Sequence, residues 1–326
     1  MQQTRACHLI ILYTIQHSCH HSMETFPKTQ CDTLRVRLKS HWDAVAEMLV
    51  IPGTRAEPLH SRLTTDTGGL YTPQQLDRAL GTIGTARRVL LTTGFYVPGT
   101  QTESGMGGSE SDGPPGTALL CLSLLGLSHI SGVGVVTERC NEDVVSAALS
   151  AVGVRDRVTL HVLPDTEGPL PYASDYDTLI SIEKCGVAAD GTFRVSALVQ
   201  GWDKDRTVGV ADGGNEIGCG SILSAVHECV TNGSTIACVV PCSALILASV
   251  SNWGGYALAA LLNTLSPTPL PLDGLASRAR AAEHAVLDAG GVHGLTGGWV
   301  DGLPVAAHDA FWVKMEGLVE RLAKGE

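Results

Sequence analysis

The sequence predicts an α/β protein whose mostly parallel sheet is flanked by helices, in a three-layer, Rossmann-like arrangement. From Arg87 onward, short β-branched apolar runs alternate with helical segments, which is the pattern of a parallel sheet with helical crossovers. The 37 glycines indicate many tight turns between these elements. Hydrophobic residues make up 44% of the 326 residues and charged residues only 17%, so we expect a substantial buried core.

The predicted strands are short runs that are apolar on both faces, as expected for strands buried between layers of helices. They are Val89–Thr93, Gly132–Thr137, Val158–Leu163, Thr178–Glu183, Thr207–Ala211, Thr235–Val240 and Leu245–Val250.

The predicted helices lie between and after these runs. They are Gly116–Leu127, Asn141–Val152, Gly220–Thr231, Gly254–Asn263, Ala276–Ala289 and His308–Leu322. Ala118–Leu127 and Tyr256–Leu262 carry almost no charge, so both helices should be buried between other elements.

The part of the chain before the predicted sheet has a pattern of helices without strands. Apolar residues from Asp32 to Leu49 follow helical spacing and predict one amphipathic helix. A polar stretch runs through Gly69, and Thr72 then caps a short helix with Pro73 in its first turn. We therefore divide the chain into a leader over 1–22, an N-terminal helical appendage over 23–86 and an α/β domain over 87–326.

The composition of the chain bears on its binding partners and on its cell compartment. A net charge of -11 without a basic run argues against nucleic acid as a partner, and no apolar stretch approaches the ~20 residues that cross a membrane. Residues 1–22 contain no acid and have a faint likeness to a mitochondrial presequence, although Met23 is an alternative start. We expect the protein in the mitochondrial matrix, with the cytoplasm as the alternative. The sequence does not determine the oligomeric state, and a homo-oligomer is one of the states that it allows.

Four loops follow predicted strands directly, and in an open α/β sheet such loops bind the ligand. They should share one edge of the sheet. Their residues are Thr92-Thr93-Gly94-Phe95, Ser181-Ile182-Glu183, Ala211-Asp212-Gly213-Gly214-Asn215-Glu216 and Ser251-Asn252-Trp253-Gly254-Gly255.

The loop from Asp212 to Glu216 is acidic and rich in glycine, which argues against a phosphate-binding loop and favours a cation. Asp212 and Glu216, with Asn215 beside them, offer the oxygen ligands that Mg, Mn or Ca prefer. The alternative is a capped turn in which Asp212 binds backbone N–H groups and Glu216 begins the next helix.

Two further acids also allow both a functional and a structural interpretation. Asp112 precedes a buried helix and either points into an active site or caps that helix. Glu183 ends an apolar strand, where a carboxylate is costly unless it binds a metal or is paired, for example with Lys184.

Together these stretches resemble the C-terminal conserved domain of D-glutamate cyclases, over about residues 87–323. The matching pieces occur in family order: Thr92-Thr93-Gly94-Phe95, Ser111-Asp112-Gly113-Pro114-Pro115-Gly116, Ile182-Glu183 with Ala188-Ala189-Asp190-Gly191, Asp212-Gly213-Gly214-Asn215-Glu216, Val250-Ser251-Asn252-Trp253-Gly254-Gly255-Tyr256-Ala257-Leu258 and Val300-Asp301-Gly302-Leu303-Pro304. The resemblance implies a hydro-lyase that converts D-glutamate into 5-oxo-D-proline and water.

We therefore expect an acidic cleft that holds a divalent metal, Mg, Mn or Ca, and takes D-glutamate as a small-molecule substrate. The expected catalytic and metal-binding acids are Asp112, Glu183, Asp212 and Glu216, with Glu183 as the general base. The expected substrate-binding residues are Thr93, Gly94, Asn215, Asn252 and Trp253. A metal-dependent phosphoesterase and a non-catalytic ligand-binding module are the alternatives.

Overall fold

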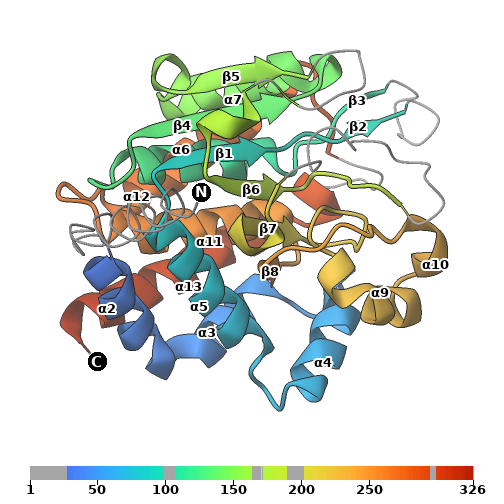
Figure 1. Cartoon of the computed structure of the whole chain (residues 1–326), viewed down its shortest axis with the longest axis horizontal. Helices are drawn as coiled ribbons and strands as arrows, with labels where there is room; N and C mark the ends of the chain where they lie inside the picture. Colours follow the sequence, from blue (N-terminus) through green and yellow to red (C-terminus); the bar gives the residue numbers. More distant parts are fainter. Residues whose placement is uncertain are drawn as a thin grey trace, which may run out of the picture.

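The computed structural model describes residues 28–98, 107–163, 170, 172–188, 202–293 and 299–325 (Figure 1). Its centre is a six-stranded sheet in which every pair of neighbours is parallel, in the order β5-β4-β1-β6-β7-β8. This confirms the predicted α/β class. The strands are β1 (Arg88–Thr92), β4 (Gly132–Thr137), β5 (Thr159–Val162), β6 (Thr178–Ile182), β7 (Thr207–Ala211) and β8 (Ala244–Leu247).

The strand order reverses between β1 and β6. The chain runs outward from β1 to β4 and β5, then returns to β6 and continues outward through β7 and β8 on the other side. Loops at the carboxyl ends of β1 and β6 therefore leave the sheet in opposite directions and open a crevice between them. This is the place where a doubly wound sheet binds its ligand.

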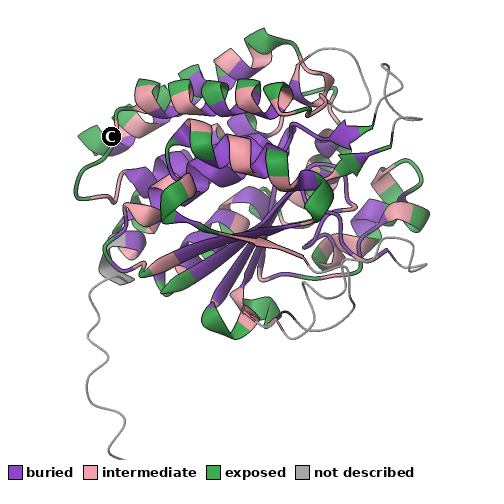
Figure 2. Cartoon of the chain, turned by 90° about the horizontal axis from the view of Figure 1, so that it is seen from above, coloured by how far each residue is buried: buried purple, intermediate pink, exposed green. Residues whose placement is uncertain are grey.

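Residues that alternate along β1 pack on two different faces of the sheet. Val89 and Leu91 join the main core, whereas Leu90 belongs to a separate apolar cluster with Tyr176. Most strand residues are buried, as Figure 2 shows. The main core includes residues of α6 (Pro114–Leu125), α7 (Glu142–Val152), α11 (Ser251–Asn263), α12 (Leu272–Asp288) and α13 (Val305–Lys324).

Three of the four described N-terminal helices, all but Ala56–Asp66, share this core with the sheet. The helix predicted over Asp32–Leu49 is interrupted by a 3-10 turn at Lys39–His41, and the polar stretch before Gly69 contains an additional helix. The helices are α2 (Lys28–Leu38), α3 (Trp42–Leu49), α4 (Ala56–Asp66) and α5 (Tyr71–Gly84), the last of which contacts β8. The boundary between residues 86 and 87 stays a prediction, and the leader over 1–22 lies outside the described residues.

One predicted strand is wrong. Thr235–Val240 forms no strand, because a short helix, α10 (Gly233–Ile236), ends inside it and Cys238 makes only an isolated bridge with Ala188. Asn232 adopts a left-handed φ of 59°, and the N–H groups of Ile236 and Ala237 then bond helically to the carbonyls of Asn232 and Gly233. The run is apolar because Cys238 is buried, which a strand pattern does not distinguish.

The remaining described elements are small. They are a two-stranded antiparallel ribbon of β2 (Tyr96–Val97) and β3 (Gly108–Ser109), the helix α9 (Leu223–Cys229), and 3-10 turns at Arg139–Asn141, Arg155–Arg157, Ala173–Asp175, Lys204–Arg206, Gly220–Ile222 and Val300–Gly302. Within the described ranges, none of the helices combines the length and the apolar character that a membrane span requires.

Candidate active site

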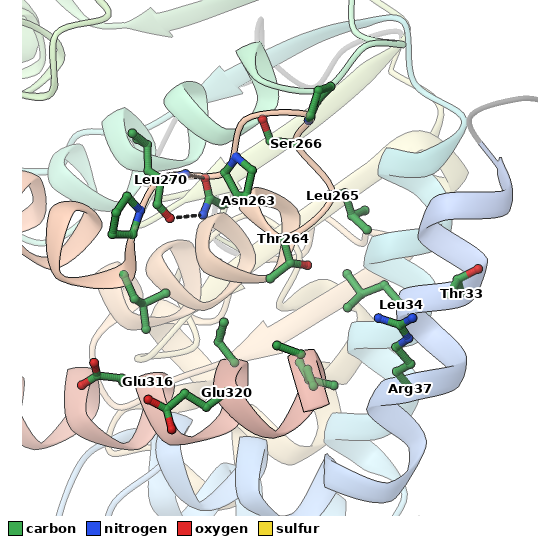
Figure 3. A pocket seen from close by; sticks show the side chains of 17 residues that line it. Thr33, Leu34, Arg37, Asn263, Thr264, Leu265, Ser266, Leu270, Glu316 and Glu320 are labelled. Carbon is green, nitrogen blue, oxygen red and sulfur yellow. Dashed lines mark hydrogen bonds between the residues drawn. The ribbon is translucent and has the colours of Figure 1, made fainter. Parts of the chain in front are cut away.

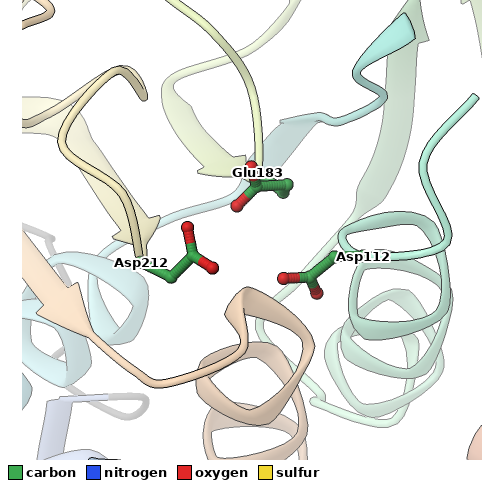
Figure 4. A group of neighbouring side chains, drawn as sticks. All are labelled: Asp112, Glu183 and Asp212. Carbon is green, nitrogen blue, oxygen red and sulfur yellow. The ribbon is translucent and has the colours of Figure 1, made fainter. Parts of the chain in front are cut away.

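Three buried carboxylates meet at the carboxyl end of the sheet. Asp112 precedes α6, Glu183 follows β6 and Asp212 follows β7, and one oxygen from each lies within 4.8 Å of the others. Figure 4 shows the three carboxylates pointing toward one another. None is more than 4% exposed. The structure thus brings together three of the four predicted metal ligands.

Asp112 reaches this position because α6 and α11 approach closely. A Cβ at Gly255 would lie 3.0 Å from the backbone of Gly116, so glycines allow the two helices to touch. Asp112 then accepts hydrogen bonds from the N–H groups of Ser251 and Asn252 at 2.7 and 2.6 Å. It therefore caps α11 and not the helix that follows it in sequence, and the positive end of the α11 dipole favours its charge.

Gly113 is required where the loops after β1 and β6 meet. Its φ is 99°, and a Cβ there would lie 2.5 Å from Thr93 Oγ1 and 2.8 Å from Glu183 Cβ. Thr93 is therefore directly beside the acids, and its buried Oγ1 has no hydrogen-bond partner among the described residues. Gly94 is packed against Thr137 and its carbonyl accepts a hydrogen bond from Lys184 Nζ at 2.8 Å.

Glu183 is held in a strained conformation. Its φ of 46° is in the left-handed region, which costs a residue with a side chain roughly 1–3 kcal/mol and is found mostly at functional sites. The Ser251 hydroxyl donates to Glu183 Oε2 at 2.6 Å. Lys184 does not pair with Glu183, since its ammonium instead contacts Glu138.

The turn after β7 reverses the roles expected for a capped turn. Glu216 accepts the N–H groups of Asp212, Gly213 and Gly214 at 3.0, 2.7 and 2.7 Å, so both of its oxygens organise the backbone. Asp212 Oδ2 instead accepts a hydrogen bond from Arg55 at 2.8 Å, and its buried Oδ1 has no partner among the described residues. Asn215 donates to Cys185 Sγ at 2.8 Å.

Arg55, Asp301 and Glu110 complete the site and were not predicted. Arg55 Nη2 bridges Asp212 and Asp301, with both distances 2.8 Å. Asp301 has a left-handed φ of 55° and lies in a stretch that matched the family, which is the signal that could have found it. Glu110 precedes Asp112 in the same acidic stretch and is also buried. Arg55 follows no strand and belongs to no motif, so the sequence gives it no signal.

Burial sets the protonation of the acids. It raises the pKa of Asp112, Glu183 and Asp212 well above the usual carboxyl range, and repulsion from neighbouring acids raises each pKa further. Burial also raises the pKa of Glu110 to about 7. For Glu216, burial acts in the same direction, but interactions with Asp212 and with the backbone N–H of Gly213 outweigh it and lower the pKa.

Asn252 and Trp253 are occupied by contacts within the protein. Asn252 Oδ1 accepts the N–H groups of Gly113 and Gly116 at 3.0 and 2.7 Å, which ties the start of α6 to α11. The Trp253 ring stacks on Phe311 with centroids 5.4 Å apart, and its indole N–H donates to His308 Nδ1 at 3.1 Å. Both side chains therefore contact other parts of the protein and help to hold the start of α11 in place beside the acids.

The chemistry of the donors fits a hard divalent cation held by Asp112, Glu183 and Asp212. Carboxylate oxygens are the ligands that Mg, Mn and Ca prefer, and a cation would offset the repulsion that raises their pKa values. Asp212 Oδ1, which no described residue hydrogen-bonds, is an oxygen that could bind it. Glu216 does not belong to this group, and its two oxygens bind the N–H groups of Asp212, Gly213 and Gly214 in its own turn.

A large cavity lies elsewhere and contains none of these acids. It has a volume of about 870 Å³ and is formed by α2, by the connection between α11 and α12, and by the end of α13 (Figure 3). Arg37 on one wall and Glu316 and Glu320 on another surround an apolar interior. The chemistry of the molecule is therefore argued from the acids at the sheet edge and not from this cavity.

Two comparisons relate this chain to known proteins. Residues 62–316 match the model of the family described as D-glutamate cyclase-like, C-terminal. A similar protein is human D-glutamate cyclase, mitochondrial, which is 30% identical over 229 residues, covering 61% of this chain and 36% of the human protein. The chain thus spans about a third of that relative. Since the family model covers most of the chain, including the three clustered acids, the chain belongs to the family of D-glutamate cyclase-like C-terminal domains.

Proposed function

We propose that this chain is a carbon–oxygen lyase that converts D-glutamate into 5-oxo-D-proline and water, at a divalent cation held by Asp112, Glu183 and Asp212. The observation that carries the proposal is the convergence of these buried carboxylates within 4.8 Å, together with an Asp212 oxygen that has no hydrogen-bond partner among the described residues. Membership of the family and the name of the human relative support the reaction class.

The reaction moves two protons from nitrogen to oxygen. The α-ammonium group of glutamate must lose a proton before nitrogen attacks the γ-carboxyl carbon, and the new amide loses a second one. One γ-oxygen takes up both protons and leaves as water, so the equation balances without another reactant. A bound divalent cation would polarise the γ-carboxylate and stabilise the charge on its oxygens.

Glu183 is the proposed proton acceptor. Its Oε2 is fixed by the Ser251 hydroxyl, while Oε1 has no hydrogen-bond partner among the described residues and can accept a proton from the amine. Asp112 is held rigid by the N-terminus of α11, and Glu216 holds the turn that presents Asp212. Thr93, whose hydroxyl has no hydrogen-bond partner in the part of the chain that the structure describes, is the proposed substrate hydrogen-bond donor at the β1 loop.

The test is to incubate the purified protein with D-glutamate or L-glutamate after chelation and after adding Mg, Mn or Ca, and to follow 5-oxoproline by chiral chromatography. We expect product from D-glutamate only when a divalent cation is present. Asp212→Asn should lower the rate about 100-fold or more, because it removes a charged cation ligand. Absence of product under every condition would reject the proposed reaction, and phosphate released from phosphate esters would favour a phosphoesterase instead.

We also propose that the chain acts in the mitochondrial matrix. The support is the faint presequence character of residues 1–22 and the printed name of the human relative. Fractionation of cells that express the chain with a C-terminal tag tests this. Protease protection inside intact mitochondria is the expected result, and recovery of the chain in the cytosol would contradict it.

A further inference from the structure

We infer that Arg55 binds the α-carboxylate of the substrate and thereby selects an amino acid whose α-carboxyl group is free. The inference rests on the proposed function and adds a residue that lies outside the part of the chain matched by the family, 62–316. Cyclisation changes the charge of the amine and of the γ-carboxylate only. The α-carboxylate stays negative from substrate to product, so a buried site must offer it a fixed cation.

The site is strongly acidic, and among the residues that the structure describes Arg55 is the cation that contacts Asp212 and Asp301. Its guanidinium lies 2.8 Å from an oxygen of each of these acids, and an arginine side chain stays positively charged in proteins. Lys184 is engaged by Glu138 and by the Gly94 carbonyl. An anionic substrate would be repelled by the remaining carboxylates, so its fixed charge has to lie beside Arg55.

The guanidinium has an edge available for a carboxylate. Both contacts to Asp212 and Asp301 use the single nitrogen Nη2, which leaves Nε and Nη1 without an acid partner among the described residues. The Arg55 side chain is 52% exposed, whereas Asp212 is 1% and Asp301 15% exposed. Arg55 is therefore the member of the group that solvent and a ligand reach first, and its planar fork can bind a carboxylate through two N–H groups.

The backbone before Arg55 is fixed to the sheet edge. Ser249, which follows β8, accepts the N–H of Ile51 through its hydroxyl at 2.8 Å, and its own N–H donates to Leu49 at 2.8 Å. The Thr54 and Ser249 hydroxyls are also 2.8 Å apart. The two acids then orient the guanidinium from the other end. Such support on both sides reduces the entropy lost when a ligand binds.

The experiment compares D-glutamate with its α-amide, D-isoglutamine, which keeps the amine and the γ-carboxylate but lacks the α-charge. For the wild type we expect kcat/KM to favour D-glutamate by roughly 10- to 150-fold, the equivalent of hydrogen bonds to a charged group. Arg55→Gln should abolish this preference, mainly through a higher KM for D-glutamate, and Arg55→Lys should restore part of it. Arg62→Gln is the control, because Arg62 lies on α4 but pairs with the exposed Asp66 and Glu228.

A structural role for Arg55 gives a different result. If Arg55→Gln lowers kcat/KM for both compounds by the same factor, the preference is unchanged and the inference is wrong. A wild type that uses the amide as well as D-glutamate would overturn it even if Arg55→Gln does not fold.

A binding measurement separates this inference from the proposed reaction. If the wild type makes no 5-oxoproline, the reaction fails, but calorimetric titration with each compound still tests Arg55. Tighter binding of D-glutamate than of D-isoglutamine, with the difference lost in Arg55→Gln, would support the role of Arg55. Equal binding of the two compounds, or binding of neither, would overturn it.

Discussion

At the scale of single residues, the acids of the site differ in what their oxygens do. Asp112 and Glu216 each accept three backbone N–H groups, which keeps them fixed. For Glu216 such interactions outweigh burial and lower the pKa, whereas for Asp112 burial outweighs them and the pKa stays raised. Asp212 and Glu183 each keep an oxygen without a hydrogen-bond partner among the described residues. We therefore expect the two glutamates to differ when they are substituted, with Glu216 affecting mainly stability and Glu183 mainly activity.

Glu216→Gln should mainly lower stability. An amide can still accept the N–H groups of Asp212 and Gly213 through its oxygen, but its NH₂ group would face the N–H of Gly214, now at 2.7 Å from Oε2. Leaving that buried N–H unpaired costs about 1–3 kcal/mol. Urea denaturation gives the change in the free energy of unfolding, and Glu228→Gln, an exposed acid, is the control. Equal stability of the two variants would contradict the role assigned to Glu216.

Glu183→Gln should mainly lower activity. The proton acceptor is lost, so we expect 5-oxoproline formation to fall about 100-fold or more. Its free energy of unfolding should stay equal or rise, since the amide removes the repulsion that Glu183 experiences from Glu216 and Asp112. The two measurements are product formation at saturating D-glutamate and urea denaturation of the same sample. Loss of both activity and stability would mean that Glu183 serves the fold, and Glu142→Gln, at the exposed start of α7, should change neither.

At the scale of elements, the sequence predicts the regular parts and misses the irregular ones. Gly132–Thr137 and Thr207–Ala211 are strands with the bounds expected, because β-branched runs bounded by turns have few alternatives. Thr235–Val240 has the same apolar character for a different reason, namely burial against the second face of the sheet. The helix Ala56–Asp66 was missed because it is mostly polar, with only Ala56 and Leu59 buried.

The close contact between the β1 loop, the β6 loop and α6 can be tested with two glycines. Gly113→Ala places a methyl group 2.5 Å from Thr93 Oγ1 at a φ of 99°, so we expect a loss of stability greater than strain alone and a large loss of activity. Gly153→Ala is the matched control, since its φ is 84° and nothing lies within 4 Å of the added Cβ. Strain alone costs roughly 1–2 kcal/mol. Thermal unfolding of both variants measures the loss of stability. Equal melting temperatures of the two variants, with activity retained in Gly113→Ala, would contradict the close contact of Gly113 with Thr93.

At the scale of the whole molecule, the carboxyl-end rule explains which part of the site is predictable. It gathers the loops after β1, β6 and β7 at one edge, so sequence reasoning could place Thr93, Glu183 and Asp212 near one another. The rule does not predict Arg55, which lies in the segment before the sheet. The neighbouring Thr54 is held at the sheet edge by its contact with Ser249, and Arg55 pairs with Asp212. Nor does the rule separate Glu216 from the other acids, because that depends on how one turn directs its N–H groups.

The buried acids should also make stability depend on pH and on divalent cations. In the folded state the pKa of Asp112, Glu183 and Asp212 is raised by burial, and burial raises that of Glu110 to about 7. An acid with a raised folded pKa binds more protons when folded, so stability is greatest at low pH and falls as pH rises from the unfolded pKa of about 4 through the folded value.

Histidines oppose this trend only at lower pH. His308, whose pKa burial lowers to about 4, contributes stability that grows up to its unfolded value of about 6.5 and is constant above it. Between about pH 6.5 and 7.5, below the range in which the cysteine thiols of the unfolded chain titrate, the acids therefore determine the slope. We expect the melting temperature of the chelated protein to fall over this range and to become nearly constant with saturating Mg or Mn, because a cation replaces the protons that the acids lose. Calorimetry gives the slope of melting temperature against pH. If this slope is the same with and without divalent cations, Asp112, Glu183 and Asp212 do not bind a cation together.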